Sequence, residues 1–477
     1  MDGRRSGEQP SPGGADETIR YLAVRGPADR AEAGHLVVPT RLEIEKAVAN
    51  AARSFLATKH LATFQRSKIL RKVAELLASR SGELAIDLAR EAGKPIRSAR
   101  AEVERSVATF LSAAAEVDAG TWEAMPLDVN AASAGRWGVV KRFPLGPVLA
   151  ITPFNFPLNL VAHKVAPAIA VGAPVVNKPA TKTPLSARAL REIVVEAGWP
   201  QEAYAFLPIP GAETDALVRD PRLPVISFTG SSAVGWKLRE AAPRKRVSLE
   251  LGGNAAVIVH ADADPVDAAA RAVGGAFGYA GQSCISVQRI LVHRSLFHRF
   301  RDELLEKTAH LVVGDPLEES TDVGPMISEA EAERALLWIE EAVAQGAQVL
   351  AGGHGNDGFV EPTVLTETTR SMKVESHEVF APVVTLNAYD DFDEALRRVN
   401  DSVYGLQAGL FTRDLGLVQK AFEALEVGAL VVNDVPTWRA DRMPYGGVKD
   451  SGNGREGPRW AMEELTEPRL LVLRPPG

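Results

Sequence analysis

The chain has 477 residues, one cysteine and a formal net charge of −7. This length exceeds what one hydrophobic core usually organises, so we expect two or three domains. One cysteine excludes an intrachain disulfide, and with it a disulfide-stapled secreted scaffold. The charge balance gives no basic face for nucleic acid, and no apolar run reaches the ~18 residues of a membrane span.

The N-terminal part of the chain is a polar segment followed by helical patterns. Residues 1–20 are polar, rich in Gly and Pro, and lack the apolar core of a signal peptide, so we expect a flexible tail and a cytoplasmic protein. Hydrophobic residues then recur at helical spacing. This periodicity predicts helices over 41–57 and 64–80, a long helical stretch over about 83–118, and extended segments over 121–145.

From residue 148 onward, strand-like apolar runs alternate with amphipathic helical segments, and a second alternating block begins near 254. This pattern predicts an α/β fold with parallel sheets covered by helices, in which ligands bind at the carboxyl ends of the strands. One helix has Thr183 as its expected N-cap, Pro184 in its first turn and Gly198 at its end. The final run, residues 468–474, is a lone apolar strand, of the kind that often pairs with another subunit's sheet.

The cysteine lies in the segment GYAGQSCISVQR, residues 278–289. Glycines and small polar neighbours predict a turn at Cys284, not a packed helix or strand. A thiol becomes a nucleophile where a helix N-terminus or a nearby base stabilises its thiolate. The segment alone leaves open the alternative of a buried, inert thiol.

Two further segments place polar side chains at strand ends. VSLELGGN puts Glu250 among apolar residues, where desolvation raises a carboxyl pKa and suits it to general-base catalysis. The alternative is an ion pair with Arg246. ITPFNFPLNL puts Asn155 after a strand, where its amide can donate to a developing oxyanion. The alternative is an ordinary turn residue before Pro157.

Two glycine-containing segments bear on phosphate binding. FTGSSAVG, residues 228–235, predicts a strand-to-helix turn whose backbone N–H groups attract phosphate, although it lacks the lysine of a Walker A sequence. Residues 353–358 fit GxGxxG, but a strand pattern follows them where the dinucleotide fingerprint requires a helix. We therefore interpret residues 353–358 as a hairpin loop.

Together these segments resemble those of the aldehyde dehydrogenase superfamily. The resemblance covers about 40–474 and rests on motifs in the family's order: PFNFP, NKPA, FTGS, LELGG, GQSC, EVFAP and PYGGVKDSGNGREG. Cys284 follows Glu250 by 34 positions, as in the family. The resemblance implies oxidation of an aldehyde to its carboxylic acid with NAD or NADP, through a thiohemiacetal and a thioester on Cys284. It implies no metal, and no His/Cys metal cluster is visible in the sequence.

The resemblance also implies a role for each matching residue. Cys284 would attack the aldehyde, Asn155 and the backbone N–H of Cys284 would hold the oxyanion, and Glu250 would activate the hydrolytic water. Glu378 and Phe380 would position the nicotinamide ribose and ring. The other expected cofactor contacts are Thr152, Phe154, Lys178, Thr181, Gly211, Gly230 and Ser231.

Position 181 bears on the choice of cofactor. Strictly NAD-using members of the family often have Glu there, where a carboxylate binds the ribose hydroxyls and repels a 2′-phosphate. Thr181 removes this repulsion and Lys178 is close by, so we predict that NADP is accepted. Ala381 replaces the glycine of the usual EVFGP, a small change whose effect the sequence does not define.

The segment NDVPTWRADRMPYGG, and NLVAHK with His163, resemble those of the lactaldehyde, non-phosphorylating glyceraldehyde-3-phosphate, sulfolactaldehyde and phosphonoacetaldehyde dehydrogenases. Such substrates are short and hydroxylated or anionic. Because arginine contacts anions with two donors, the candidates for gripping an anionic tail are Arg105, Arg439 and Arg442, with His163 beside them. The alternative for each arginine is a surface or structural ion pair. Ser283 adds no positive charge next to the nucleophile, which argues against a phosphate or phosphonate.

The implied organisation is a Rossmann-like parallel-sheet cofactor domain, an α/β catalytic domain and a small β extension for oligomerisation. We assign residues 21–121 and 145–251 to NAD(P) binding, 252–449 to catalysis, and 122–144 and 462–477 to oligomerisation. The family suggests a homodimer or homotetramer.

Other functions remain open at the level of sequence. A CoA-acylating relative would pass the acyl group to CoA, which a resident base such as Glu250 disfavours. A broad-range aldehyde dehydrogenase would use the arginines structurally. A non-catalytic binding protein on this fold would not need Cys284, Glu250 and Asn155, and a cofactor-free thiol hydrolase would have no use for FTGS and EVFAP.

Overall fold

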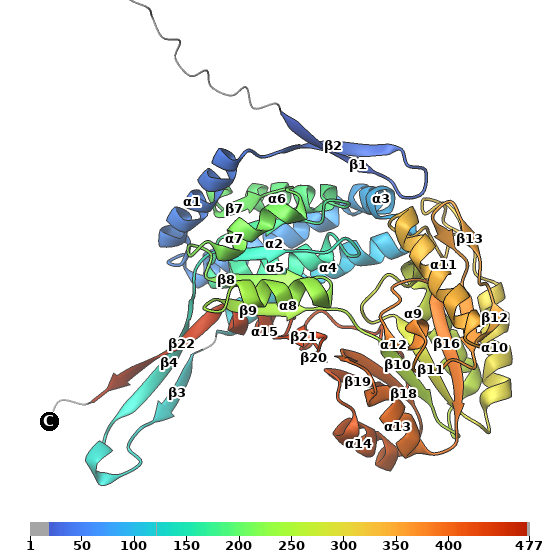
Figure 1. Ribbon diagram of the computed structural model, residues 1–477. Coiled ribbons are helices and arrows are strands. Elements are labelled where there is room, and N and C mark those ends of the chain that lie inside the picture. Colours follow the sequence, from blue (N-terminus) through green and yellow to red (C-terminus); the bar gives the residue numbers. More distant parts are fainter. Residues whose placement is uncertain (1–18, 121, 475–477) are drawn as a thin grey trace, which may run out of the picture.

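The computed structural model describes residues 19–120 and 122–474. Residues 1–18, which make up most of the predicted tail, lie outside the described residues, as do Thr121 and 475–477. Two α/β bodies lie side by side, and an arm of strands projects from the first (Figure 1). Across the described residues, no helix combines the length and apolarity that crossing a bilayer demands.

The first body is built on a sheet in the order β21-β9-β8-β5-β6-β7, parallel except at β21. Its strands are β5 (Val148–Ile151), β6 (Val175–Lys178), β7 (Tyr204–Phe206), β8 (Val225–Thr229), β9 (Arg246–Glu250) and β21 (Gly452–Asn453). From β5 the chain proceeds to β6 and β7 on one side, then returns to place β8 and β9 on the other. This reversal opens a crevice at the carboxyl ends of β5 and β8, where open α/β sheets bind ligands.

Helices cover both faces of this sheet because side chains alternate along its strands. On β5, Val148 and Ala150 face one layer, whereas Leu149 and Ile151 face the other. The first layer contains α2 (Thr63–Ser79), α3 (Ser81–Ala92), α4 (Ile96–Ala119), α5 (Asn159–Val171) and α6 (Leu185–Glu196). The second contains α1 (Arg41–Thr58), α7 (Asp215–Arg219) and α8 (Ser232–Ala241). The short elements nearby are β1 (Arg20–Arg25), β2 (Glu32–Val38), η2 (Gln201–Ala203), η3 (Gly211–Thr214) and α15 (Pro458–Glu464).

The second body has a sheet in the order β12-β15-β16-β11-β10-β18-β19, parallel except at β12. Its strands are β10 (Ala255–Val259), β11 (Val287–His293), β12 (Gln348–Ala351), β15 (Thr363–Thr366), β16 (Val383–Tyr389), β18 (Gln407–Phe411) and β19 (Ala429–Val432). One face packs on α9 (Pro265–Phe277), α10 (Phe297–Ala309), α11 (Glu329–Ala344) and α12 (Lys373–Ser376), the other on α13 (Phe392–Asn400) and α14 (Leu415–Ala424). The mixed α/β fold expected from the sequence is confirmed.

Small two-stranded pieces complete the second body. The antiparallel pair β13 (Gly355–Asn356) and β14 (Phe359–Val360) confirms that the GxGxxG pattern is a hairpin loop. The pair β17 (Tyr404–Gly405) and β20 (Val448–Lys449) precedes the return of the chain to the first body.

The projecting arm consists of β3 (Glu123–Pro126), η1 (Ala131–Ser133), β4 (Trp137–Pro144) and β22 (Thr466–Leu473), in the strand order β22-β4-β3 (Figure 1). The terminal strand β22 therefore pairs with β4 of its own chain, from Thr466 opposite Pro144 to Leu473 opposite Trp137. No second subunit is needed to complete that pairing, although the outer edge of β22 pairs with no other strand of the described chain.

The prediction of one long helical stretch over 83–118 was wrong. Helix α3 ends at Ala92, and α4 begins at Ile96. Gly93 adopts a left-handed φ of 66°, which ends a helix readily, and Pro95 keeps the residue before it out of helical conformation. The break has a consequence for the site described below, because it places the buried Lys94 in the cavity wall.

The prediction that Thr183 caps α6 was also wrong. The Thr183 hydroxyl instead donates to the carbonyl of Phe154, 3.2 Å away. The first turn of α6 is capped by the buried carboxylate of Glu91 from α3, which accepts from the N–H groups of Leu185 at 2.8 Å and Ser186 at 2.9 Å. Burial raises the pKa of Glu91 to about 7 despite these bonds. Gly198, with φ of 103°, follows the end of the helix as predicted.

Candidate active site

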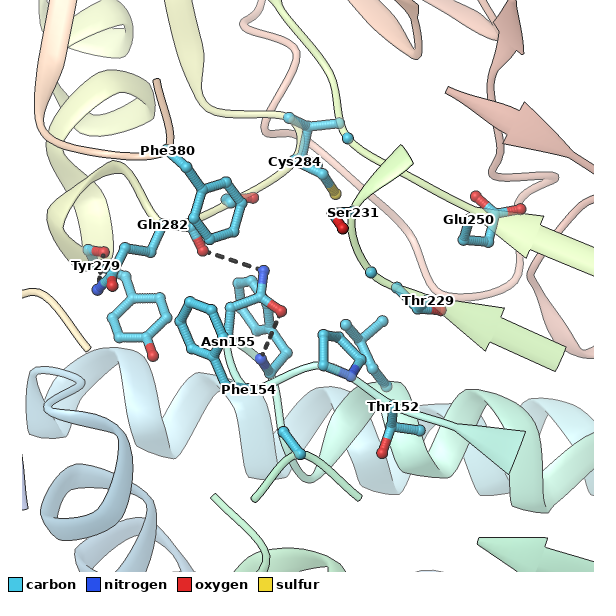
Figure 2. Close-up of a pocket in the computed structure, with 18 of the residues that line it drawn as sticks. Thr152, Phe154, Asn155, Thr229, Ser231, Glu250, Tyr279, Gln282, Cys284 and Phe380 are labelled. Carbon is cyan, nitrogen blue, oxygen red and sulfur yellow. Dashed lines mark hydrogen bonds between the residues drawn. The ribbon is translucent and has the colours of Figure 1, made fainter. Parts of the chain in front are cut away.

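A cavity of about 900 Å³ lies between the two bodies, at the carboxyl ends of β5, β6, β8 and β9. Figure 2 shows Cys284, Asn155 and Glu250 around this space, although they come from different segments of the chain. All nine residues expected to contact the cofactor also line it: Thr152, Phe154, Lys178, Thr181, Gly211, Gly230, Ser231, Glu378 and Phe380. The structure therefore brings the catalytic and cofactor candidates to one place.

Cys284 lies in a turn, as predicted, between α9 and β11. The turn follows Tyr279 and Ala280, which both have a positive φ of 52°. The Cys284 sulfur lies 2.9 Å from the hydroxyl of Tyr445. Burial raises the pKa of the Cys284 thiol to about 12, while the Tyr445 hydrogen bond acts to lower it. Cys284 lines the cavity, but its thiol needs help to ionise.

Gly252 and Gly253 join the parts of the site contributed by both bodies. The Gly253 N–H donates to the Glu378 carboxylate at 2.9 Å. A Cβ at Gly252 would collide with that carboxylate, and a Cβ at Gly253 would collide with the carbonyl of Cys284. Only residues without side chains allow Glu378 and Cys284 to approach this closely. The LELGG segment thereby fixes the spacing between the cysteine and the expected ribose-binding carboxylate.

The Asn155 amide is oriented by the backbone on both of its sides. Its oxygen accepts from the Phe156 N–H at 3.1 Å, and its nitrogen donates to the carbonyl of Gln282 at 3.1 Å. An amide nitrogen has two hydrogens, so the second remains for a ligand. The backbone N–H of Cys284 has no acceptor within the described chain. Two donors are therefore unused beside the sulfur.

Glu250 ends β9 with both carboxylate oxygens buried and without a hydrogen-bond partner among the described residues. Arg246 pairs with Glu464 at 3.9 Å, so the alternative of a Glu250–Arg246 ion pair is wrong. Burial, and then the nearby charge of Glu456, raise the pKa of Glu250 well above its usual range. Lys164 and Arg439 act in the opposite direction without reversing the effect. Such a carboxylate can take up a proton near neutral pH.

The cofactor side of the cavity combines a helix start with a cation. Ser231 is the N-cap of α8, and its side chain makes no capping bond, so the N–H groups of the first turn have no side-chain acceptor there. Lys178 ends β6, is 8% exposed and has no ion-pair partner in the described chain. Burial lowers the pKa of Lys178. On the second body, the ring of Phe380 meets that of Phe154 edge-on, with centroids 5.9 Å apart.

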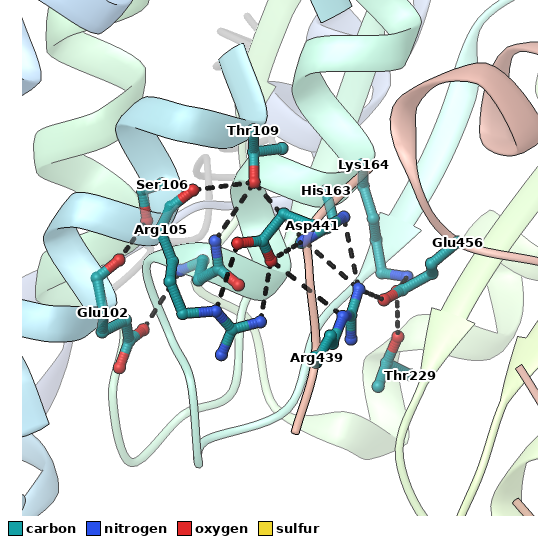
Figure 3. Close-up of polar contacts among 11 residues, drawn as sticks. Glu102, Arg105, Ser106, Thr109, His163, Lys164, Thr229, Arg439, Asp441 and Glu456 are labelled. Carbon is teal, nitrogen blue, oxygen red and sulfur yellow. Dashed lines mark hydrogen bonds and ion pairs between the residues drawn. The ribbon is translucent and has the colours of Figure 1, made fainter. Parts of the chain in front are cut away.

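Three of the basic candidates, Arg105, Arg439 and His163, lie in a largely buried polar network (Figure 3). Arg105 donates through Nε and Nη2 to Asp441, at 3.2 Å and 2.8 Å, and Arg439 donates to Glu456 at 3.1 Å. His163 lies behind the cavity wall with Nε2 2.9 Å from Asp441 Oδ1. The cavity is lined by Arg105, whose side chain is 30% exposed, and by Arg439, whose side chain is only 6% exposed.

Arg442 and His163 are not brought to the cavity. Arg442 is exposed and makes no ion pair with the described residues. Arg105 and Arg439 are both ion-paired, which is the structural alternative named for them, but Arg105 keeps Nη1 without a partner in the described chain. Of the basic candidates that line the cavity, Arg105 is the more exposed one and keeps an unused donor.

Sequence reasoning missed several residues of the site. Tyr445 and Glu456 lie in PYGGVKDSGNGREG, a segment that was noted for resemblance without a role being assigned to its side chains. Lys94 lines the cavity over the Phe156 ring, 3.7 Å from its centroid, and pairs with the buried Glu102. The Gly-Lys-Pro sequence at the helix break was the available signal for Lys94.

A parallel-sheet crevice beside a thiol, an amide and a buried carboxylate is the arrangement of a cofactor-dependent oxidoreductase that works through cysteine. The comparisons with known proteins give the family. The chain belongs to the aldehyde dehydrogenase family, whose sequence profile matches residues 15–471. It is therefore an aldehyde dehydrogenase that uses NAD(P), and both the family resemblance and the enzyme class inferred from the sequence are confirmed.

Three relatives document this similarity. The chain is 46% identical over 459 residues to 3-sulfolactaldehyde dehydrogenase of Priestia aryabhattai, with 96% of each chain covered. It is 42% identical to aldehyde dehydrogenase 21 of Physcomitrella patens in complex with succinate, with a TM-score of 0.94 and 96% of each chain covered. It is 38% identical to glyceraldehyde-3-phosphate dehydrogenase of Methanocaldococcus jannaschii complexed with NADP, with a TM-score of 0.91 and coverage of 96% and 99%.

Proposed function

We propose that this enzyme oxidises a short, anionic or hydroxylated aldehyde to its carboxylic acid, with Cys284 as the nucleophile. The observation that carries the proposal is that Cys284, Asn155 and Glu250 line one cavity from different segments of the chain. These three groups suffice for the reaction. A thiolate makes the aldehyde carbon tetrahedral, amide donors hold the resulting oxyanion, and a carboxylate activates water against the thioester.

The first half of the reaction uses Cys284 and Asn155. The Cys284 sulfur bonds to the aldehyde carbon, and the carbonyl oxygen becomes an oxyanion in a thiohemiacetal. The free hydrogen of the Asn155 amide and the N–H of Cys284 are the two unused donors that can hold this oxyanion. A bound nicotinamide supplies the acceptor for the hydride that leaves the same carbon. When the oxyanion collapses to a carbonyl, a thioester remains on Cys284.

The second half uses Glu250. Its unpartnered carboxylate takes a proton from a water molecule, and the resulting hydroxide attacks the thioester carbon. The carbon–sulfur bond breaks and releases the carboxylic acid, which returns the cysteine for another turnover. Because burial raises the pKa of Glu250, the group is a better base than an exposed carboxylate.

The residues around the cavity fit a dinucleotide. The start of α8 at Gly230 and Ser231 offers backbone N–H groups to a pyrophosphate, and Glu378 can accept from ribose hydroxyls. Lys178 and Lys182 line the cavity with Thr181, whose uncharged side chain does not itself repel a 2′-phosphate. We propose that NADP is accepted and that Lys178 contacts the added phosphate. The relative from Methanocaldococcus jannaschii that was solved with NADP supports this proposal.

The substrate class rests on Arg105. Its Nη1 is unused, and its position in the cavity wall suits a carboxylate, sulfonate or similar group at the far end of a short aldehyde. The relatives named for sulfolactaldehyde, and solved with succinate, act on or bind anionic molecules, which supports this class. Arg439, paired and almost fully buried, is proposed as structural support for the site.

The experiment is a rate comparison over short aldehydes: sulfolactaldehyde, succinic semialdehyde, lactaldehyde, glyceraldehyde-3-phosphate and an uncharged aliphatic control, each with NAD and NADP. We expect the highest kcat/KM for an anionic member. Equal kcat/KM for all aldehydes would instead indicate a broad-range enzyme. Added CoA should leave the product a free acid, because Glu250 directs the thioester to water, and formation of acyl-CoA would favour the CoA-acylating alternative. A Cys284→Ala variant that still oxidised aldehydes would overturn the mechanism.

We further propose that the β3-β4-β22 arm joins two copies of the chain. The outer edge of β22 is unpaired in the described chain, and Leu470, Leu471 and Val472 are 50%, 57% and 50% exposed. Exposed strand edges with apolar side chains are ready to pair with another sheet. Light scattering should find a dimer or tetramer that Leu471→Asp weakens. Leu415→Asp on α14, which alters another exposed leucine (82%), is the control. A monomeric wild type would reject the proposal.

A further inference from the structure

The hydroxyl of Tyr445 touches the sulfur that performs the chemistry. The two atoms lie 2.9 Å apart, and among the described residues this is the one hydrogen bond that either side chain makes. Tyr445 is 3% exposed. Its backbone is fixed by a reciprocal pair of bonds with Glu456, in which Tyr445 N–H donates to Glu456 at 3.1 Å and Glu456 N–H donates back at 2.6 Å. The backbone is therefore fixed, and burial of the side chain restricts rotation of the ring away from the sulfur.

A cation lies over the face of the Tyr445 ring. The Arg439 guanidinium is 3.7 Å from the ring centroid and is itself held by Glu456. A positive charge over an aromatic face is attracted to the ring electrons and polarises the phenol, so its O–H becomes a stronger donor. Glu456 thus holds the Tyr445 backbone through its own backbone groups and holds Arg439 through its carboxylate.

The direction of the hydrogen bond follows from the protonation of the sulfur. In the neutral thiol either atom can donate, but after ionisation only the tyrosine has a proton to give. We propose that the Tyr445 hydroxyl is a catalytic hydrogen-bond donor that stabilises the Cys284 thiolate before it attacks the aldehyde. The thiol proton leaves to solvent, and Tyr445 keeps its own. This inference rests on the proposed role of Cys284 as nucleophile.

The other charged groups that face the sulfur cannot replace this donor. Glu378, from the loop after α12, and Glu250, from β9, both disfavour a thiolate because they are acidic. Arg439 favours a thiolate through its charge, but it makes no hydrogen bond to the sulfur. Because burial opposes ionisation of Cys284, removal of the one direct hydrogen-bond donor should change the ionisation of this thiol more than removal of any other of these groups.

The test measures ionisation of the cysteine without substrate or cofactor. The chain has one cysteine, so the rate of alkylation by iodoacetamide as a function of pH reports Cys284 alone. Tyr445→Phe removes only the hydroxyl oxygen. Since a hydrogen bond to a charged group is worth about one to two units of pKa, we expect alkylation at each pH below the midpoint to slow by about 10- to 100-fold, which corresponds to a midpoint raised by about 1–2 pH units. The control is Tyr389→Phe, which removes a buried hydroxyl 2.8 Å from His260 in the second body and should leave the midpoint unchanged.

The outcomes separate this inference from the proposed function. An unchanged or lowered midpoint in Tyr445→Phe overturns the inference, while loss of aldehyde oxidation in Cys284→Ala still supports the proposed mechanism. Activity in Cys284→Ala defeats the mechanism whatever Tyr445 does to the thiol. If Tyr445→Phe does not fold, fluorinated tyrosine at position 445 keeps the ring and hydroxyl but makes a more acidic phenol. It should lower the midpoint in the folded enzyme, and an unmoved midpoint again overturns the inference.

Discussion

Replacing Glu250 by glutamine should separate the two halves of the reaction. The change keeps the size of the side chain and removes its charge at the end of β9. A positioned general base contributes a factor of about 10²–10⁴, which corresponds to ~3–5 kcal/mol of transition-state free energy. We therefore expect steady-state kcat to fall by about 10²–10⁴ with each aldehyde. Hydride leaves before water attacks, so the first turnover should still produce one equivalent of reduced cofactor per site.

The assay is stopped-flow absorbance of reduced nicotinamide, which resolves the first turnover from later ones. A burst of normal amplitude followed by a slow steady state supports the assignment. Loss of the burst to the same extent as the steady state would refute the reasoning, because Glu250 would then act before the thioester forms. An unchanged steady state would show that hydrolysis does not use this carboxylate.

The same variant makes a prediction about stability. The raised pKa of Glu250 means that the folded state binds its proton more tightly than the unfolded chain does. The stability that this group contributes is thus present below the usual carboxyl range and is lost as pH rises through the raised pKa. The glutamine of Glu250→Gln cannot ionise, so the Tm of this variant should increase relative to that of the wild type as pH rises. A Tm difference that does not depend on pH would contradict the electrostatic account.

Three further variants test other parts of the site. Thr181→Glu should lower the ratio of kcat/KM for NADP over NAD by at least about tenfold through repulsion of the 2′-phosphate, and an unchanged ratio would argue against phosphate binding there. Arg105→Met should raise KM by about tenfold or more for anionic aldehydes only, whereas an equal effect on an uncharged aldehyde would make Arg105 structural. Burial acts to raise the pKa of Glu456, but Lys164 and Arg439 outweigh burial and lower that pKa to about 2. The stability that the Glu456 carboxylate contributes to the fold is therefore present above the usual carboxyl range and is lost as pH falls toward 2. In urea titrations at neutral pH, Glu456→Gln should lower the free energy of unfolding by about 3–5 kcal/mol. The variant should also lose less stability than the wild type on acidification, and an unaltered dependence of stability on pH would contradict this role of Glu456.

Short-range patterns predicted much of the fold. Alternation of strands and helices from residue 148 gave parallel sheets, and the turn at Cys284 followed from its glycines and small neighbours. The apolar strand end at Glu250 correctly indicated a desolvated carboxylate. These features depend on residues close together in the chain, so local periodicity and turn chemistry are sufficient to find them.

The errors and omissions involve partners far apart in sequence. The cap of α6 comes from Glu91, about ninety positions earlier, and no local pattern could show that it displaces Thr183. The contact of Tyr445 with Cys284 joins two loops that are 161 positions apart in the sequence. The pairing of β22 with β4 joins the end of the chain to a segment near its first third. Such contacts depend on tertiary packing, which overrides local preference.

During synthesis of the chain, Cys284 is made before the tyrosine whose hydroxyl contacts its sulfur. Tyr445 and Glu456 belong to the segment that returns to the first body, and β21 adds to the edge of β9 only after β19 has been made. At typical translation rates, the cysteine precedes its tyrosine partner by about 10–30 s. During this interval the nascent chain carries Cys284 without the hydroxyl that contacts its sulfur in the folded enzyme. A chain that ends before residue 445 therefore contains every strand of the first sheet except β21, together with Cys284, but not the hydroxyl that contacts its sulfur.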